Sequence, residues 1–143
     1  MLTIRVWPPA LIPTLLRAIA EHLAPLIPSG VDALAGLELG GVPLATALSL
    51  HTGVPALFIR KQAKDYGTCQ LAEGGSIEGR RLLVIEDVVT SGGQVVESCH
   101  ALRALGAHVK HALCVIDRQA GGREALSAND VELHPLFVLS DIA

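Results

Sequence analysis

Apolar residues recur along this chain at two spacings, which predict helices and buried strands in turn. From Pro13 to His22 the spacing is helical, and Pro25 ends the helix. The predicted helices span residues 13–22, 44–51, 92–105 and 121–127, and the predicted strands 32–37, 55–60, 81–86, 109–116 and 131–139. Because strands alternate with helices, the sequence predicts an α/β fold, an open, mainly parallel sheet flanked by helices, in one domain over residues 1–143.

Two adjacent carboxylates, Glu86 and Asp87, end the buried strand in the stretch "RLLVIEDVVTSGGQ". Two valines follow, and then come hydroxyl-bearing residues and glycines: Thr90, Ser91, Gly92 and Gly93. In open α/β sheets ligands bind beyond the carboxyl ends of the strands, and a glycine turn into a helix makes an anion site. The pattern predicts a phosphate cradle beside hydroxyl-binding carboxylates, as a phosphorylated sugar requires. The alternative is a plain turn with helix-capping acids, which leaves two unpaired acids after a buried strand at a cost in desolvation.

The segment "VIEDVVTSGG" resembles the phosphoribosyl pyrophosphate (PRPP) motif of type I phosphoribosyltransferases. The resemblance implies that Glu86 and Asp87 bind the ribose hydroxyls as part of the catalytic machinery. It also implies that the 5-phosphate is held by the substrate-binding residues Thr90, Ser91, Gly92, Gly93 and Gln94.

The segment "FIRKQAKDYG", residues 58–67, resembles the catalytic loop of orotate phosphoribosyltransferases. The resemblance implies that Arg60, Lys61 and the catalytic Lys64 close over pyrophosphate, and that the loop reaches into a partner subunit of a homodimer. Tyr66 stands where the family often has histidine, and its hydroxyl could contact phosphate. The alternative is a solvated, charged part of the long loop predicted at 61–79.

Two further segments resemble parts of the same site. "LELGGVPLATALS" resembles the pyrophosphate-binding loop, with substrate-binding Gly40 and Gly41. "VIDRQAGG" resembles the region where an arginine contacts the orotate carboxylate, which would be Arg118. The alternative for Arg118 is a salt bridge with Asp117 or Glu124.

The resemblance implies that orotate and PRPP react to give orotidine 5-monophosphate and pyrophosphate. Mg²⁺ would be held mainly through PRPP, with no ligand set supplied by the protein alone. Two alternatives stay open at this stage: a PRPP- or nucleotide-binding regulatory protein, and a transferase for another base. The resemblance begins near Pro13, so we expect the hood over the base to be reduced or absent and orotate to be used poorly, unless Trp7 acts as a lid.

Composition narrows the classes of partner. The net charge of −3 and the scarcity of aromatic residues argue against a nucleic-acid partner. The odd set Cys69, Cys99 and Cys114 predicts reduced thiols in a cytoplasmic protein, and neither a signal peptide nor a membrane span is predicted. The six histidines are interpreted as ordinary surface or core residues, and His108 and His111 are expected on opposite sides of their strand.

Overall fold

A computed structural model describes residues 12–61 and 71–142. The helices are α1 (Pro13–Leu23), the 3-10 turn η2 (Ala24–Leu26), α2 (Gly41–Thr52), α3 (Gly93–Ala104), α4 (Gly122–Ser127) and α5 (Leu139–Ile142). The strands are β1 (Ala33–Leu37), β2 (Ala56–Ile59), β3 (Ala72–Glu73), β4 (Arg81–Val89), β5 (His108–Asp117) and β6 (Glu132–Val138).

The described strands form one six-stranded sheet in the order β3-β2-β1-β4-β5-β6. Neighbouring strands are parallel, except that β3 runs antiparallel to β2. The predicted open, mainly parallel sheet is therefore confirmed. Three short elements were not predicted: η2, which follows α1, β3, which lies inside the expected loop at 61–79, and α5 at the end of the described chain. No helix in the described ranges is long and apolar enough to cross a membrane.

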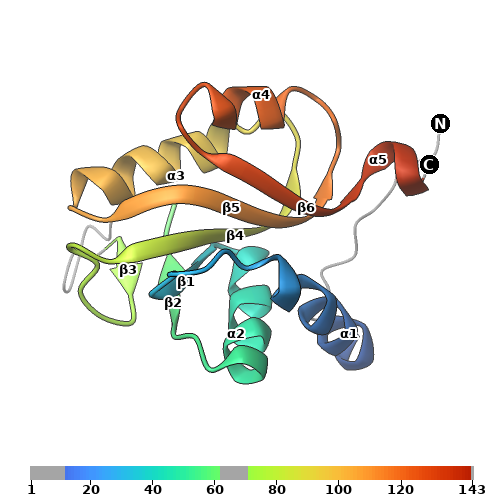
Figure 1. Ribbon diagram of the computed structural model, residues 1–143, viewed down its shortest axis with the longest axis horizontal. Helices are drawn as coiled ribbons and strands as arrows, with labels where there is room; N and C mark the ends of the chain where they lie inside the picture. The colour runs from blue at the N-terminus through green and yellow to red at the C-terminus, as the bar shows by residue number, and fades with distance from the viewer. Residues whose placement is uncertain (1–11, 62–70, 143) are drawn as a thin grey trace.

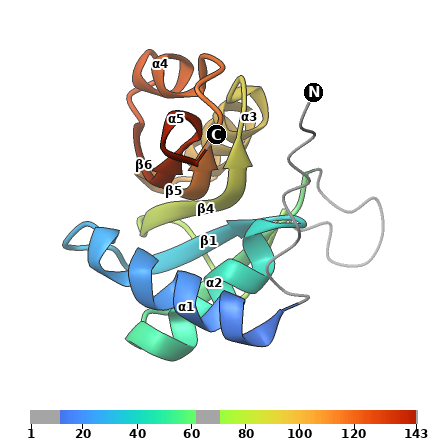
Figure 2. The ribbon, with the colours of Figure 1, turned by 90° about the vertical axis from the view of Figure 1, so that its right-hand side faces the viewer.

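Helices cover both faces of this sheet, with α3 and α4 on one side and α1 and α2 on the other (Figures 1 and 2). Alternate side chains of β4 pack into two hydrophobic cores, one on each face of the sheet. Val84 packs in the core under α3, whereas Leu83 and Ile85 pack in the core over α2. Each strand of the sheet centre is thus buried on both faces, which is why these strands read as continuous apolar runs.

Strand β4 is longer than predicted, and this extension positions both acids. The sequence places the end of the strand at Glu86, but β4 continues to Val89 because β5 keeps pairing with it as far as Asp117. Strand β1, the neighbour on the other side of β4, stops pairing earlier, because the last pair between them joins Gly36 to Ile85. Glu86 and Asp87 therefore lie inside β4, beyond the point where β1 turns away.

Helix α2 starts three residues before the predicted position, at Gly41. A Cβ atom at Gly36 would lie 2.6 Å from the carbonyl oxygen of Gly41, and one at Gly41 would collide with the carbonyl oxygen of Ile85. Two glycines thus let the first turn of α2 press against the sheet. Pro43 belongs to that first turn, where a missing N–H removes no intrahelical hydrogen bond.

Candidate active site

The two acids on β4 share one environment but differ in their contacts. Glu86 is half-buried, and one of its carboxylate oxygens accepts a 3.0 Å hydrogen bond from the backbone N–H of Asp87. Burial, and after it the hydrogen bond to the Asp87 side chain, raises the pKa of Glu86 to about 8. Glu86 therefore keeps its proton near neutral pH while no cation is bound beside it.

Asp87 is held against the loop that follows β1. One carboxylate oxygen of Asp87 accepts a 2.8 Å hydrogen bond from the N–H of Val88. A Cβ atom at Gly40 would collide with both carboxylate oxygens of Asp87, so the predicted pyrophosphate loop and the acid touch one another. The structure thus brings together two segments that are more than forty positions apart in the sequence.

The turn at residues 90–93 leads from β4 into α3. Thr90 and Ser91 are exposed, and Gly92 adopts a left-handed conformation with φ of +82° at the N-cap of α3. A Cβ atom at Gly92 would lie 3.0 Å from Cα of Gly122, so glycine is favoured there by both conformation and space. No side chain of the described residues caps α3, which leaves the amide groups of its first turn for an anion. Gln94, the last residue of the predicted cradle, is exposed in that turn.

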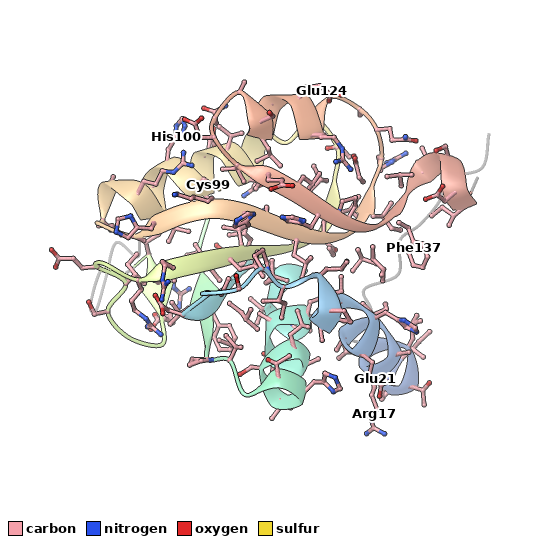
Figure 3. All side chains as sticks on the ribbon, viewed as in Figure 1. Arg17, Glu21, Cys99, His100, Glu124 and Phe137 are labelled. Atoms are coloured by element: carbon pink, nitrogen blue, oxygen red, sulfur yellow. The ribbon has the colours of Figure 1, made fainter. Side chains whose placement is uncertain are left out.

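Arg118 follows β5 at the same edge of the sheet. Its backbone N–H donates to the carbonyl oxygen of Val89, at 2.9 Å, while its side chain is exposed. Within the described ranges it forms no ion pair. Asp117 is instead buried, accepts a 2.9 Å hydrogen bond from the N–H of Gln119 and lies 3.8 Å from Nε of Arg123. Glu124 points outward from α4 (Figure 3), so neither salt bridge considered for Arg118 is formed.

The predicted cationic loop is described only at its start. Arg60, the residue after β2, forms a 3.2 Å ion pair with Glu73 on β3. Lys61 is exposed, its backbone N–H donates to a carboxylate oxygen of Glu38, and its charge acts to lower the pKa of Glu86. Lys64 and Tyr66 lie outside the described residues. Of the described cations in this loop, Lys61 lies near Glu86, whereas Arg60 is paired with Glu73.

Both described cysteines are free and buried. Cys99 lies on α3 (Figure 3) within the core beneath that helix, and burial raises the pKa of its thiol to about 11. Burial likewise raises the pKa of the Cys114 thiol to about 12. These two cysteines thus form no disulfide with each other, and Cys69 lies outside the described residues.

Known proteins of one family resemble this chain over most of its length. Residues 10–136 match the model of the phosphoribosyl transferase domain. An orotate phosphoribosyltransferase of Nocardioides sp. is 48% identical over 91% of this chain and 73% of its own length. One of Methanosarcina acetivorans is 46% identical over 91% of this chain and 70% of its own length.

Solved structures agree with these relatives. The orotate phosphoribosyltransferase of Mycobacterium tuberculosis, in complex with PRPP, aligns with a TM-score of 0.82 and 30% identity over 93% of this chain and 78% of that one. The UMP synthase of Leishmania donovani aligns with a TM-score of 0.82 and 25% identity over 93% of this chain, but over only 29% of its own.

Proposed function

The chain belongs to the phosphoribosyltransferase family, and from that membership we propose that it is an orotate phosphoribosyltransferase. The reaction joins orotate to the 5-phosphoribosyl group of PRPP and releases pyrophosphate, giving orotidine 5-monophosphate. The observation that carries the proposal is the placement of Glu86 and Asp87 at the end of β4, one short turn before a helix N-terminus with no side-chain cap among the described residues. The similarity to orotate phosphoribosyltransferases over nine tenths of the chain supports the choice of base.

The two acids and the turn after them would hold the ribose 5-phosphate part of PRPP. Both side chains would accept hydrogen bonds from the ribose hydroxyls, because a cation bound beside Glu86 favours its ionised form. The backbone N–H groups at the start of α3 and the hydroxyls of Thr90 and Ser91 would donate to the phosphate. The sugar would thus be held through its hydroxyls and its 5-phosphate, which fixes the position of the anomeric carbon.

Departure of pyrophosphate leaves a cationic, oxocarbenium-like sugar, so stabilisation of charge is the main task of the protein. The loop at Gly40 and Gly41 touches Asp87 and would receive the pyrophosphate beside the ribose. Lys61 and the predicted catalytic Lys64 would neutralise the leaving group. Arg118, whose side chain has no ion pair in the described ranges, would clamp the orotate carboxylate with two parallel hydrogen bonds.

Mg²⁺ fits this donor set. Two carboxyl groups, ribose hydroxyls and pyrophosphate oxygens are all hard oxygen ligands, and Mg²⁺ at phosphate sites keeps several waters. The ion would be held mainly through PRPP, with Asp87 and Glu86 next to it, and would supply charge neutralisation on the pyrophosphate. Such a cation would also favour the ionised form of Glu86.

We also propose an oligomeric state and a cellular location for this protein. We expect a homodimer in which the loop at Arg60–Gly67 serves the partner's site, one phosphoribosyltransferase-like domain per chain, and a cytoplasmic protein. No nucleic-acid or membrane partner is part of the proposal.

A panel of bases tests the choice of substrate. The protein is incubated with PRPP, Mg²⁺ and either orotate, uracil, adenine or hypoxanthine, and the nucleotide products are separated and identified. We expect orotidine 5-monophosphate alone. A nucleotide formed from another base, or PRPP binding with no product from any of them, would overturn the proposal.

A further inference from the structure

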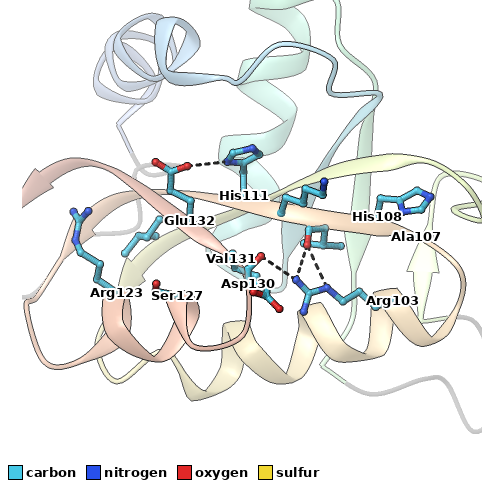
Figure 4. Close-up of a pocket in the computed structure, with 12 residues that line it drawn as sticks. Arg103, Ala107, His108, His111, Arg123, Ser127, Asp130, Val131 and Glu132 are labelled. Carbon is cyan, nitrogen blue, oxygen red and sulfur yellow. Dashed lines mark hydrogen bonds and ion pairs between the residues drawn. The ribbon is translucent and has the colours of Figure 1, made fainter.

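His111, Glu132 and His134 form a cluster on β5 and the edge strand β6, away from the candidate active site. His111 on β5 pairs in register with Glu132 on β6, and His134 lies two residues further along β6. Figure 4 shows His111 and Glu132 side by side on the face of the sheet that is turned away from α3. The cluster lies near the amino ends of its strands, whereas Glu86 lies three pairs further along the ladder, about 10 Å in the strand direction.

The three side chains turn one ligand atom each toward a common point. Nδ1 of His111 lies 3.0 Å from Nε2 of His134 and 3.7 Å from Oε2 of Glu132. The third side of the triangle, from Nε2 of His134 to Oε2 of Glu132, measures 3.9 Å. A circle through the corners of such a triangle has a radius of about 2.1 Å, which matches the metal–ligand distances of zinc sites.

We propose that His111, Glu132 and His134 form a binding site for one divalent transition-metal ion of the Zn²⁺ type. Two imidazole nitrogens and one carboxylate oxygen suit Zn²⁺ and its neighbours, whereas Mg²⁺ and Ca²⁺ prefer oxygen ligands throughout. A water molecule would supply a fourth ligand on the exposed side. The ion would clamp the edge strand β6 to β5 and would be separate from the Mg²⁺ of the proposed reaction.

The surroundings favour this reading over a simple hydrogen bond between the two imidazoles. Both rings are largely buried, with 32% and 24% of their side-chain surfaces exposed, so the nitrogen positions are set by packing. Glu132 is 69% exposed and can adjust to an ion. Two of the three residues, His111 and Glu132, line a pocket of about 1040 Å³, which leaves the ion a route from solvent.

The sequence did not predict this cluster, because an irregularity in β5 changes which residues share a face. Arg81 pairs with His108 and Leu83 pairs with His111, so Lys110 is an extra residue in the ladder. His108 and His111 consequently occupy the same face, and the expectation that they face opposite sides is wrong. His108 therefore serves as a matched control, since it is a nearby exposed histidine on the same strand outside the triangle.

Calorimetric titration of Zn²⁺ into metal-free protein tests the proposal, with excess Mg²⁺ present to occupy sites made of oxygen ligands. We expect one equivalent to bind, and binding to weaken at least about tenfold in Glu132→Gln and in His134→Gln but not in His108→Gln. The Glu132 variant changes an exposed side chain, so its result does not depend on refolding of the core. Nuclear magnetic resonance of the unaltered protein should show the His111 and His134 ring nitrogens shifting on addition of Zn²⁺. No stoichiometric binding, equal binding by Glu132→Gln and His134→Gln, or shifts confined to other histidines would overturn the site.

Discussion

Replacing Glu86 by glutamine should stabilise the protein above neutral pH. The carboxyl of Glu86 has its pKa raised from 4.5 to about 8, mainly by burial. Between these two pH values the unfolded chain has lost the proton that the folded chain keeps. The folded state then binds more protons than the unfolded one, so the free energy of unfolding falls as pH rises through this window. Glutamine has no such proton to lose.

The size of the effect follows from the two pKa values. Each pH unit of difference is equivalent to 1.36 kcal/mol, which gives an upper limit of about 5 kcal/mol. Because Glu86 keeps some contact with water and part of the penalty is screened, we expect about half of this limit. The gain of Glu86→Gln should therefore grow from below about 1 kcal/mol at pH 5 to about 2–3 kcal/mol at pH 8.

Urea unfolding followed by circular dichroism at pH 5, 6, 7 and 8 measures this difference. Glu97→Gln is the matched control, because it removes an exposed carboxylate from α3 and should change stability by less than about 0.5 kcal/mol at every pH. A Glu86→Gln protein that is no more stable than the parent at pH 8, or whose gain is independent of pH, would refute the assignment of a buried, protonated Glu86.

Three further predictions concern the proposed reaction. The double variant Glu86→Gln/Asp87→Asn should keep its fold, as measured by circular dichroism, but should bind Mg²⁺–PRPP at least about tenfold more weakly in calorimetry. The reason is that charge-assisted hydrogen bonds contribute roughly 1.5–3 kcal/mol each. Unchanged affinity would contradict the assignment of these two residues to the ribose hydroxyls. Arg118→Lys should raise the KM for orotate more than that for PRPP, since a lysine cannot form the bidentate clamp, and an equal change in both would argue against it. Mixing Lys64→Ala with Asp87→Asn under conditions of proven subunit exchange should restore part of the activity that each lacks, and no recovery would speak against a shared loop.

The sequence predicted those features that depend on neighbouring residues. Apolar spacing located the strands and helices of the parallel sheet, and Gly106, predicted to stop α3, follows it with φ of +91°. The acids and the glycine turn could also be predicted, because residues 86–93 are contiguous in the sequence and form the end of β4, the turn and the start of α3.

What the sequence did not predict depends on pairing between distant segments. The continuation of β4 to Val89 requires the register with β5, and the pair of Arg60 with Glu73 requires β3 to fold back onto β2. The histidine cluster requires both an extra residue at Lys110 and the register of β6. None of these has a signal in local spacing, since contacts across a sheet are set by strand order and register.

The most direct test of the central claim is the product formed from orotate. Purified protein, PRPP, Mg²⁺ and orotate are combined, and orotidine 5-monophosphate and pyrophosphate are both quantified, with Glu86→Gln/Asp87→Asn run in parallel. The proposal predicts equal amounts of the two products from the unaltered protein and at least about a hundredfold slower formation by the double variant, because its losses in sugar binding act on the transition state. Absence of orotidine 5-monophosphate from the unaltered protein, or its formation at an equal rate by the double variant, would contradict the account.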